Sequence, residues 1–166
     1  MVAVVGFPHG TTTPSVKGYE AREAVEAGAT EVDVACNISS FLSGDEEGFL
    51  RDLRGVVDTA PTTKAIVETG LLNDEQKRRI ARLCVEADVD YVKTCTGYAP
   101  GKATVEDVRL LSDAVGDDAL VKASGGIRDA ETARALLRAG ASRIGTSAGA
   151  KILREAHRDG GLPPKE

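Results

Sequence analysis

The chain has 166 residues, of which 42% are hydrophobic and 28% are charged, and its formal net charge is −5. This composition is typical of a single globular domain with a sizeable core, and it excludes a disordered chain. The acidic balance without any basic run argues against a nucleic-acid partner, and no apolar run approaches the roughly 20 residues that span a membrane. Three cysteines without metal-type spacing predict reduced thiols in a cytoplasmic protein, and two distant histidines predict no metal site.

Six β-type runs alternate with helical segments along the chain. The runs are expected over residues 2–7, 31–37 and 64–70, at two short strands that end at Lys93 and Lys122, and over 143–147. Helices are expected from residue 14 to about 28, over 44–57, from 73 to about 87, from 104 to 115, from 129 to 140, and shortly after 147. Side chains that can cap a first turn precede four of them, namely Thr13, Asn73, Thr104 and Asp129. Regular alternation of this kind predicts parallel strands with helices outside them.

An internal repeat supports this architecture. Residues 26–33, 86–93 and 138–145 share one pattern, in which a helix ends, the chain turns tightly and a strand begins. The pattern predicts an α/β fold of the (β/α)8 TIM-barrel type, with about six βα units in this chain. An open doubly wound sheet is the alternative, although no Gly-x-Gly-x-x-Gly motif follows the first strand. In a barrel, functional groups lie at the carboxyl ends of the strands, which is where the unusual residues of this sequence occur.

Lysines stand at the ends of two successive buried strands. Lys93 follows Tyr91-Val92 and precedes small residues and a glycine, and Lys122 repeats this design one unit later. A lone lysine in such a place would snorkel to the rim or pair with a carboxylate. Two amines on one rim favour a shared site, because a neighbouring ammonium and partial desolvation both lower the pKa of a lysine and make it nucleophilic. We therefore predict Schiff-base chemistry, with Asp33 as the third ionisable group of the rim.

Glycine-rich turns follow the same strands and predict a phosphate site. Backbone N–H groups in such turns, close to helix starts, attract an anion together with the helix dipole. The turns contain Gly97, Gly125-Gly126 and Gly145-Thr146-Ser147. A single glycine would indicate only an ordinary turn between a strand and a helix. Several of them, in the last two units, match the usual phosphate site of such barrels.

These segments together resemble the deoxyribose-phosphate aldolase family. The matching motifs follow the family's order up to about residue 153; they are Val-Gly-Phe-Pro-His-Gly from residue 5, Glu-Val-Asp-Val from 31, Ile-Val-Glu-Thr-Gly from 66, Val-Lys-Thr-Cys-Thr-Gly from 92, Val-Lys-Ala-Ser-Gly-Gly-Ile-Arg from 121 and Arg-Ile-Gly-Thr-Ser from 143. The family is a class I aldolase on a (β/α)8 barrel that needs neither a metal nor an organic cofactor. It cleaves 2-deoxy-D-ribose 5-phosphate reversibly to D-glyceraldehyde 3-phosphate and acetaldehyde, so the resemblance implies a small phosphorylated sugar as substrate.

The resemblance also implies a role for each site residue. Lys93 would be the Schiff-base lysine, and Lys122 and Asp33 would be its partners in proton transfer. The candidates for substrate and phosphate contacts are Thr96, Gly97, Gly125, Gly126, Gly145 and Ser147. No metal ligand and no cofactor are expected.

The sequence departs from the family pattern at two site positions. Cys95 and Ala148 stand where serine is common. Strand alternation places the Cys95 thiol on the side of Lys93, which predicts sensitivity to thiol reagents, although a tolerated small residue is the alternative. Ala148 predicts one phosphate hydrogen bond fewer.

The chain also differs from the family in length. The family barrel begins with two further βα units, so the chain is expected to be incomplete at its N-terminus, with an aldolase-type barrel domain over residues 1–155 and a polar tail over 156–166. Unpaired strand edges at 2–7 and 143–147 predict association into a homo-oligomer or poor folding, and activity below that of a longer chain. A non-catalytic remnant of the barrel and a related Schiff-base aldolase for another phosphorylated aldehyde are the alternative interpretations.

Overall fold

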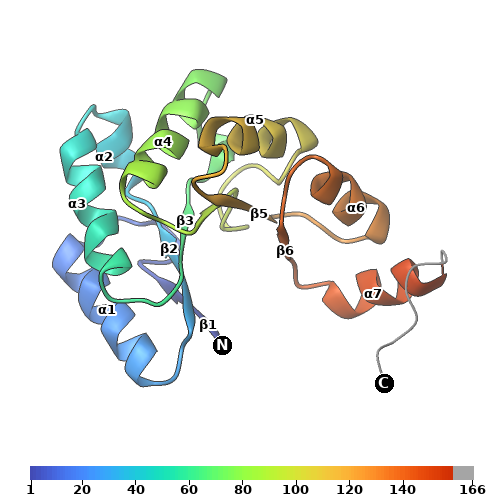
Figure 1. Ribbon diagram of the computed structural model, residues 1–166, viewed down its shortest axis with the longest axis horizontal. Helices are drawn as coiled ribbons and strands as arrows, with labels where there is room; N and C mark the ends of the chain where they lie inside the picture. The colour runs from blue at the N-terminus through green and yellow to red at the C-terminus, as the bar shows by residue number, and fades with distance from the viewer. Residues whose placement is uncertain (159–166) are drawn as a thin grey trace.

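The protein folds as a curled parallel sheet with helices on its outer side (Figure 1). The computed structural model describes residues 1–158. Six parallel strands pair in chain order. They are β1 (Val2–Val5), β2 (Glu31–Ala35), β3 (Thr63–Ile66), β4 (Tyr91–Lys93), β5 (Leu120–Ser124) and β6 (Arg143–Gly145). The prediction of a TIM-barrel-type fold with about six βα units is confirmed, and the six strands form a half-barrel.

Helices connect the strands, as the alternation predicts. They are α1 (Pro14–Glu26), α2 (Ile38–Leu42), α3 (Glu46–Val57), α4 (Asp74–Glu86), α5 (Val105–Val115), α6 (Ala130–Arg138) and α7 (Gly149–Arg158), with a 3-10 turn, η1, at Thr69–Leu71. Asn73 and Gln76 form a capping box at the start of α4, and the side chains of Thr104 and Asp129 cap α5 and α6. These three caps confirm the helix starts predicted from the sequence.

The first turn of α1 and the connection after β2 differ from expectation. Thr13 precedes α1, but its hydroxyl lies 3.1 Å from the Ser15 hydroxyl and makes no cap hydrogen bond. An unexpected short helix, α2, precedes α3. Asn37 caps α2, and Gly44, at a φ of +84°, then turns the chain toward α3. This connection therefore contains a helix of its own, between the run over 31–37 and the helix over 44–57 that the sequence predicted.

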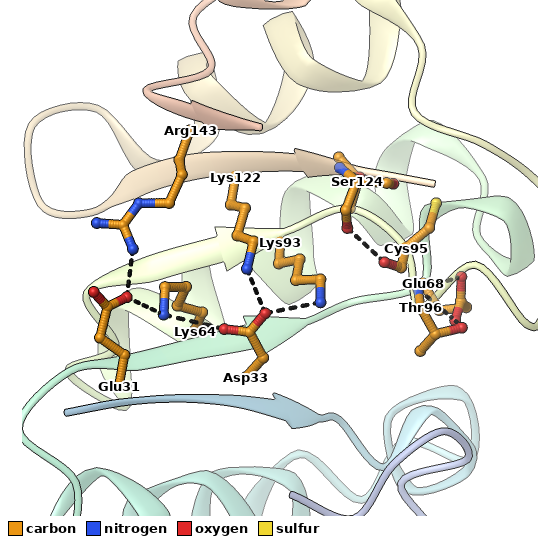
Figure 2. Close-up of polar contacts among 11 residues, drawn as sticks. Glu31, Asp33, Lys64, Glu68, Lys93, Cys95, Thr96, Lys122, Ser124 and Arg143 are labelled. Atoms are coloured by element: carbon orange, nitrogen blue, oxygen red, sulfur yellow. Dashed lines mark hydrogen bonds and ion pairs between the residues drawn. The ribbon is translucent and has the colours of Figure 1, made fainter. Parts of the chain in front are cut away.

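The two faces of the sheet differ because successive side chains of a strand point to opposite sides. The outer face packs against the helices through apolar residues that are at most 2% exposed, among them Val32, Val34, Ala65, Val92, Val121 and Ala123. The inner face carries charged side chains, namely Glu31, Asp33, Lys64, Lys93, Lys122 and Arg143 (Figure 2). The apolar core therefore lies between sheet and helices, and the ionisable groups gather inside the curl.

The last helix, α7, runs through Arg158, so the expected domain limit at 155 falls inside it. Residues 159–166 of the expected tail lie outside the described residues, and the division into domain and tail stays a prediction. Within residues 1–158, no helix has the length and apolar character that crossing a membrane requires.

Candidate active site

The side chain of Asp33 joins two lysines on the inner face of the sheet (Figure 2). Asp33 Oδ2 accepts hydrogen bonds from Lys93 Nζ at 2.8 Å and from Lys122 Nζ at 2.5 Å. Asp33, Lys93 and Lys122 are 2%, 7% and 8% exposed, respectively. The structure thus brings together the three ionisable residues that the sequence places at the site.

Strand register accounts for this meeting. Lys93 on β4 and Lys122 on β5 are direct partners in the parallel pairing, so their side chains emerge side by side on one face. Asp33 lies on β2, with β3 between it and β4, and it faces the lysines because the sheet curls. The backbone therefore sets two amines against one carboxylate without help from a flexible loop.

Asp33 is an anion in this arrangement. Burial raises the pKa of Asp33, but the hydrogen bonds from Lys122 and Lys93 outweigh burial and hold that pKa at about 2. Burial lowers the pKa of Lys122, against the hydrogen bond to Asp33, and the positive charges of Lys93 and Lys64 lower it further. Lys122 therefore gives up its proton more readily than an exposed lysine does.

Three further charged residues extend the cluster, and none of them was predicted for the site from the sequence. Lys64 on β3 is buried, with its Nζ 3.1 Å from Asp33 Oδ1 and 2.5 Å from Glu31 Oε2. Arg143 on β6 forms an ion pair with the same Glu31 oxygen. The available signal was a period of two, because Glu31 and Asp33 alternate with valines that pack outward, so both carboxylates must face inward.

A cavity of about 470 Å³ opens beside Lys93 at the carboxyl ends of β4, β5 and β6. All six residues predicted for substrate and phosphate contacts line it, namely Thr96, Gly97, Gly125, Gly126, Gly145 and Ser147. Lys93 is the member of the ionisable trio that lines the cavity, and it contacts Asp33 on its other side. Lys93 is therefore the amine that is placed to reach a bound molecule.

Positive groups also border this cavity. Arg128, an exposed residue that lines the cavity, was not predicted as a site residue, although it ends the motif of residues 121–128. A guanidinium binds phosphate well because its N–H groups form charge-assisted, bidentate hydrogen bonds. Helix α7 begins at Gly149, two residues after the lining residue Ser147, so the positive end of its dipole lies near the cavity.

Hydroxyl groups attach the ends of β4 and β5 to each other. Thr94 Oγ1 donates to Ser124 O at 2.7 Å and accepts from Ser124 N at 2.9 Å. Ser124 Oγ in turn donates to Cys95 O at 2.6 Å. These bonds hold the backbone that directly follows Lys93 against the end of β5.

The end of β3 joins the same rim through a carboxylate. β3 stops at Ile66, earlier than the run over 64–70 predicted, and Glu68 adopts a left-handed φ of +50°. Glu68 Oε2 accepts from Thr96 Oγ1 at 2.5 Å, and the same hydroxyl accepts from Tyr98 N at 3.1 Å. The Thr96 hydroxyl thus already donates its one hydrogen bond to Glu68. Toward a ligand it can therefore act only as an acceptor.

The prediction that Cys95 is open to thiol reagents is wrong. Cys95 is 1% exposed, and its thiol lies 3.4 Å from the Thr69 hydroxyl. Burial raises the pKa of this thiol, which keeps it in the less reactive protonated form. Strand β4 ends at Lys93, so the alternation of the strand does not extend to Cys95. The residue fits the alternative interpretation, a tolerated small side chain.

Fold and site together define the class of the protein. Parallel strands curl with helices outside. A lysine amine lies at the carboxyl end of β4 beside a second lysine within β5, an arrangement suited to barrel enzymes that work through a nucleophilic amine. Within residues 1–158, no group of three or more His, Cys, Asp or Glu side chains is arranged to hold a metal ion.

Comparison with known proteins shows the family. The chain belongs to the DeoC/LacD family of aldolases, whose family model matches residues 3–159. A deoxyribose-phosphate aldolase from Shouchella clausii is 49% identical over 153 residues, which cover 90% of this chain and 68% of that protein. One from Enterococcus faecalis is 47% identical over 160 residues, which cover 95% of this chain and 73% of that protein. The protein is therefore an aldolase, a carbon–carbon lyase, as the resemblance in the sequence implied.

A solved structure shows the same fold. The deoxyribose phosphate aldolase from Aeropyrum pernix, described as having a unique tetrameric structure, is 34% identical with a TM-score of 0.84. The alignment covers 95% of this chain and 67% of that chain.

Proposed function

We propose that this aldolase cleaves 2-deoxy-D-ribose 5-phosphate reversibly to D-glyceraldehyde 3-phosphate and acetaldehyde. One observation carries the proposal: the Lys93 amine shares a carboxylate with Lys122 and lines a cavity that is otherwise bordered largely by glycine-rich turns. The relatives from Shouchella clausii and Enterococcus faecalis are named for this activity, which supports the same substrate for this chain.

In this proposal the reaction takes place on Lys93. The free amine attacks the C1 aldehyde carbon of the open-chain sugar, and loss of water forms a protonated imine. The C3 hydroxyl then loses its proton and the C2–C3 bond breaks. Its electron pair forms the C1–C2 double bond of an enamine while D-glyceraldehyde 3-phosphate departs. Protonation of C2 and hydrolysis of the resulting imine release acetaldehyde and restore the amine.

Lys122 and Asp33 divide the supporting roles. A carboxyl with a pKa of about 2 is a weak base, so Asp33 serves mainly as the anion that orients both amines. Burial lowers the pKa of Lys122, which favours Lys122 as the group that exchanges protons with the C3 hydroxyl and with C2, directly or through water.

The phosphate group is proposed to occupy the part of the cavity formed by the last two βα units. A Cβ atom at Gly145 would lie 2.9 Å from Ser124 Cβ, so only glycine lets this backbone approach so closely. Arg128 and the start of α7 supply positive charge there. A phosphate ester fits this combination better than a neutral sugar does.

We further propose that the enzyme is a homo-oligomer in the cytoplasm. The Aeropyrum pernix relative is described as tetrameric, which supports assembly of several copies. The three cysteines are free and buried, which fits a reducing compartment. Light scattering coupled to size exclusion measures the assembly, and a monomer at all concentrations would contradict this part of the proposal.

The test of the function is imine trapping combined with a cleavage assay. Acetaldehyde and borohydride, followed by peptide mapping, should place an ethyl adduct on Lys93, and the protein should release acetaldehyde from 2-deoxyribose 5-phosphate. Lys93→Ala should lose both signals and keep a cooperative melting transition. Lys77→Ala, which removes a lysine that joins α4 to Asp107 of α5 away from the cavity, is the control and should keep both signals. An adduct found only on another lysine would contradict the nucleophile, and trapping without cleavage would contradict the substrate.

A further inference from the structure

A third buried lysine, Lys64, faces the site from β3, the strand between those of Asp33 and Lys93. Lys64 is 0% exposed, and its Nζ lies 3.1 Å from Asp33 Oδ1 and 2.5 Å from Glu31 Oε2. The second oxygen of Asp33, Oδ2, accepts from both Lys93 and Lys122. The two oxygens of one carboxylate are therefore divided between Lys64 and the two site amines.

Further charged side chains lie beyond Lys64, toward the amino-terminal ends of the strands. Glu31 also pairs with Arg143 of β6. The ring of Tyr91 lies beside both cations, with its centroid 5.8 Å from Lys64 Nζ and 4.9 Å from the central guanidinium carbon of Arg143. Figure 2 shows positive and negative groups alternating from Arg143 to the site amines, with Lys64 between two carboxylates.

Comparison with Lys17, which is equally buried, shows what is particular to Lys64. Lys17 on α1 donates to Ala35 O at 2.8 Å and also binds Asp52 of α3, so it attaches two helices to a strand. Among residues 1–158, by contrast, neither Lys64 Nζ nor Asp33 Oδ1 finds a hydrogen bond of good geometry, although these atoms are 3.1 Å apart. Lys64 therefore acts on Asp33 through its charge and not through a directional bond.

We propose that Lys64 is a positioning residue of the site, an inference that rests on the aldolase function proposed above. Its charge holds Asp33 Oδ1, so that Oδ2 faces Lys93 and Lys122, and it places a third positive charge beside the two amines. The lowered pKa of Lys122 fits this role: burial is its main cause, and the charges of Lys93 and Lys64 contribute. A positive charge at Lys64 disfavours further positive charge on the neighbouring amines, and imine formation needs a free amine.

Two substitutions should change the field at the site in opposite directions. Lys64→Met removes a positive charge and keeps a similar volume. Glu31→Gln removes the carboxylate that partly neutralises Lys64, so the positive field at Asp33 becomes stronger. The pKa of Glu31 is lowered, chiefly by its contact with Lys64, so Glu31 is ionised throughout the useful pH range. The charged groups that face Asp33 are Glu31 from its own strand, Lys64, Lys93 and Lys122 from β3, β4 and β5, and, through Glu31, Arg143 from β6.

The experiment is the pH dependence of imine trapping with acetaldehyde and cyanoborohydride. The acidic limb of this profile should move to higher pH by about one unit in Lys64→Met, and to lower pH in Glu31→Gln. Lys17→Met is the matched control, because it removes an amine that is also 0% exposed but lies between helices. It should lower the melting temperature and leave the limb in place.

The opposite signs make the result decisive. The positioning role would be overturned if the acidic limb stayed in place, if it moved in the same direction in Lys64→Met and Glu31→Gln, or if it moved equally in Lys17→Met. Structural damage alone gives no reason for the two shifts to have opposite signs. If Lys64→Met fails to fold, Glu31→Gln decides alone, since the Glu31 side chain is 24% exposed and better tolerates change. If the parent chain traps no imine, the proposed function fails. The acetylation rate of Lys93 and Lys122 by acetic anhydride across pH, read by mass spectrometry, then tests the same two opposite shifts.

Discussion

Replacing Asp33 by asparagine should destabilise the protein near neutral pH, and this effect should disappear as the pH falls. The pKa of Asp33 is about 2, against an ordinary value of 3.8. The difference of nearly two units, at about 1.4 kcal/mol per unit, corresponds to roughly 2–3 kcal/mol in the free energy of unfolding. A lowered pKa in the folded state means that this stabilisation is present above about pH 4 and is lost as the pH falls toward about 2.

Urea unfolding of the parent chain and of Asp33→Asn, at a series of pH values from 7 down to 2.5, measures this effect. The variant should be less stable by roughly 2–3 kcal/mol at pH 7, because three lysines then face each other without their shared carboxylate, and the gap should narrow below about pH 4. A gap that stays constant over the whole range would refute the reasoning, since it would show that the ionised form of Asp33 has no special stabilisation.

Asp52→Asn is the matched control for this experiment, because Asp52 is a buried aspartate paired with Lys17 away from the site. Burial raises the pKa of Asp52 despite that pair, so the folded state favours its protonated form. A raised pKa contributes stability that is present at low pH and lost as the pH rises. The stability difference between the parent and Asp52→Asn should therefore change with pH in the direction opposite to that for Asp33→Asn.

Three other predictions concern catalysis and the rim of the cavity. Lys122→Leu should move the acidic limb of the pH–rate profile to higher pH, because Lys93 loses a positive neighbour, while imine trapping at high pH survives; an unmoved limb would show that the two amines do not interact. Arg128→Ala should raise KM for the sugar phosphate by about 10-fold or more, as expected for a lost charge-assisted hydrogen bond, and should leave trapping with phosphate-free acetaldehyde unchanged. Equal losses in both assays would argue against a phosphate contact. Iodoacetamide should label Cys95 in urea but not in the folded protein, and rapid labelling of the folded protein would contradict its burial.

The features that depend on neighbouring residues could be predicted from the sequence. The caps at Asn73 and Thr104 and the apolar periods located the helices, because these signals are local. Regular alternation of strands and helices leaves few topologies besides a parallel sheet paired in order. Once the strands pair in order, Lys93 and Lys122 have to become neighbours, so the centre of the site followed from the same pattern.

The features that depend on tertiary geometry could not be predicted. The pairing of Glu31 with Arg143 needs the curl of the sheet, which no local pattern specifies. The orientation of Cys95 depends on where β4 stops, and the residue just beyond that point, Thr94, bonds to Ser124 of the neighbouring strand. The alternation of side chains between the two faces holds within β4, and it does not hold for Cys95, just beyond the end of that strand.

The inner charged contacts have a further consequence, which concerns how the chain folds. Strand pairing joins segments that follow each other in sequence, such as Val4 with Asp33. The contacts inside the curl join segments separated by 60 residues for Asp33 and Lys93, 89 for Asp33 and Lys122, and 112 for Glu31 and Arg143. Closing a longer loop costs more entropy, so these contacts should form after neighbouring strands have paired. A folding chain can therefore hold most of its backbone hydrogen bonds before it has the curvature that assembles the lysines and their carboxylate.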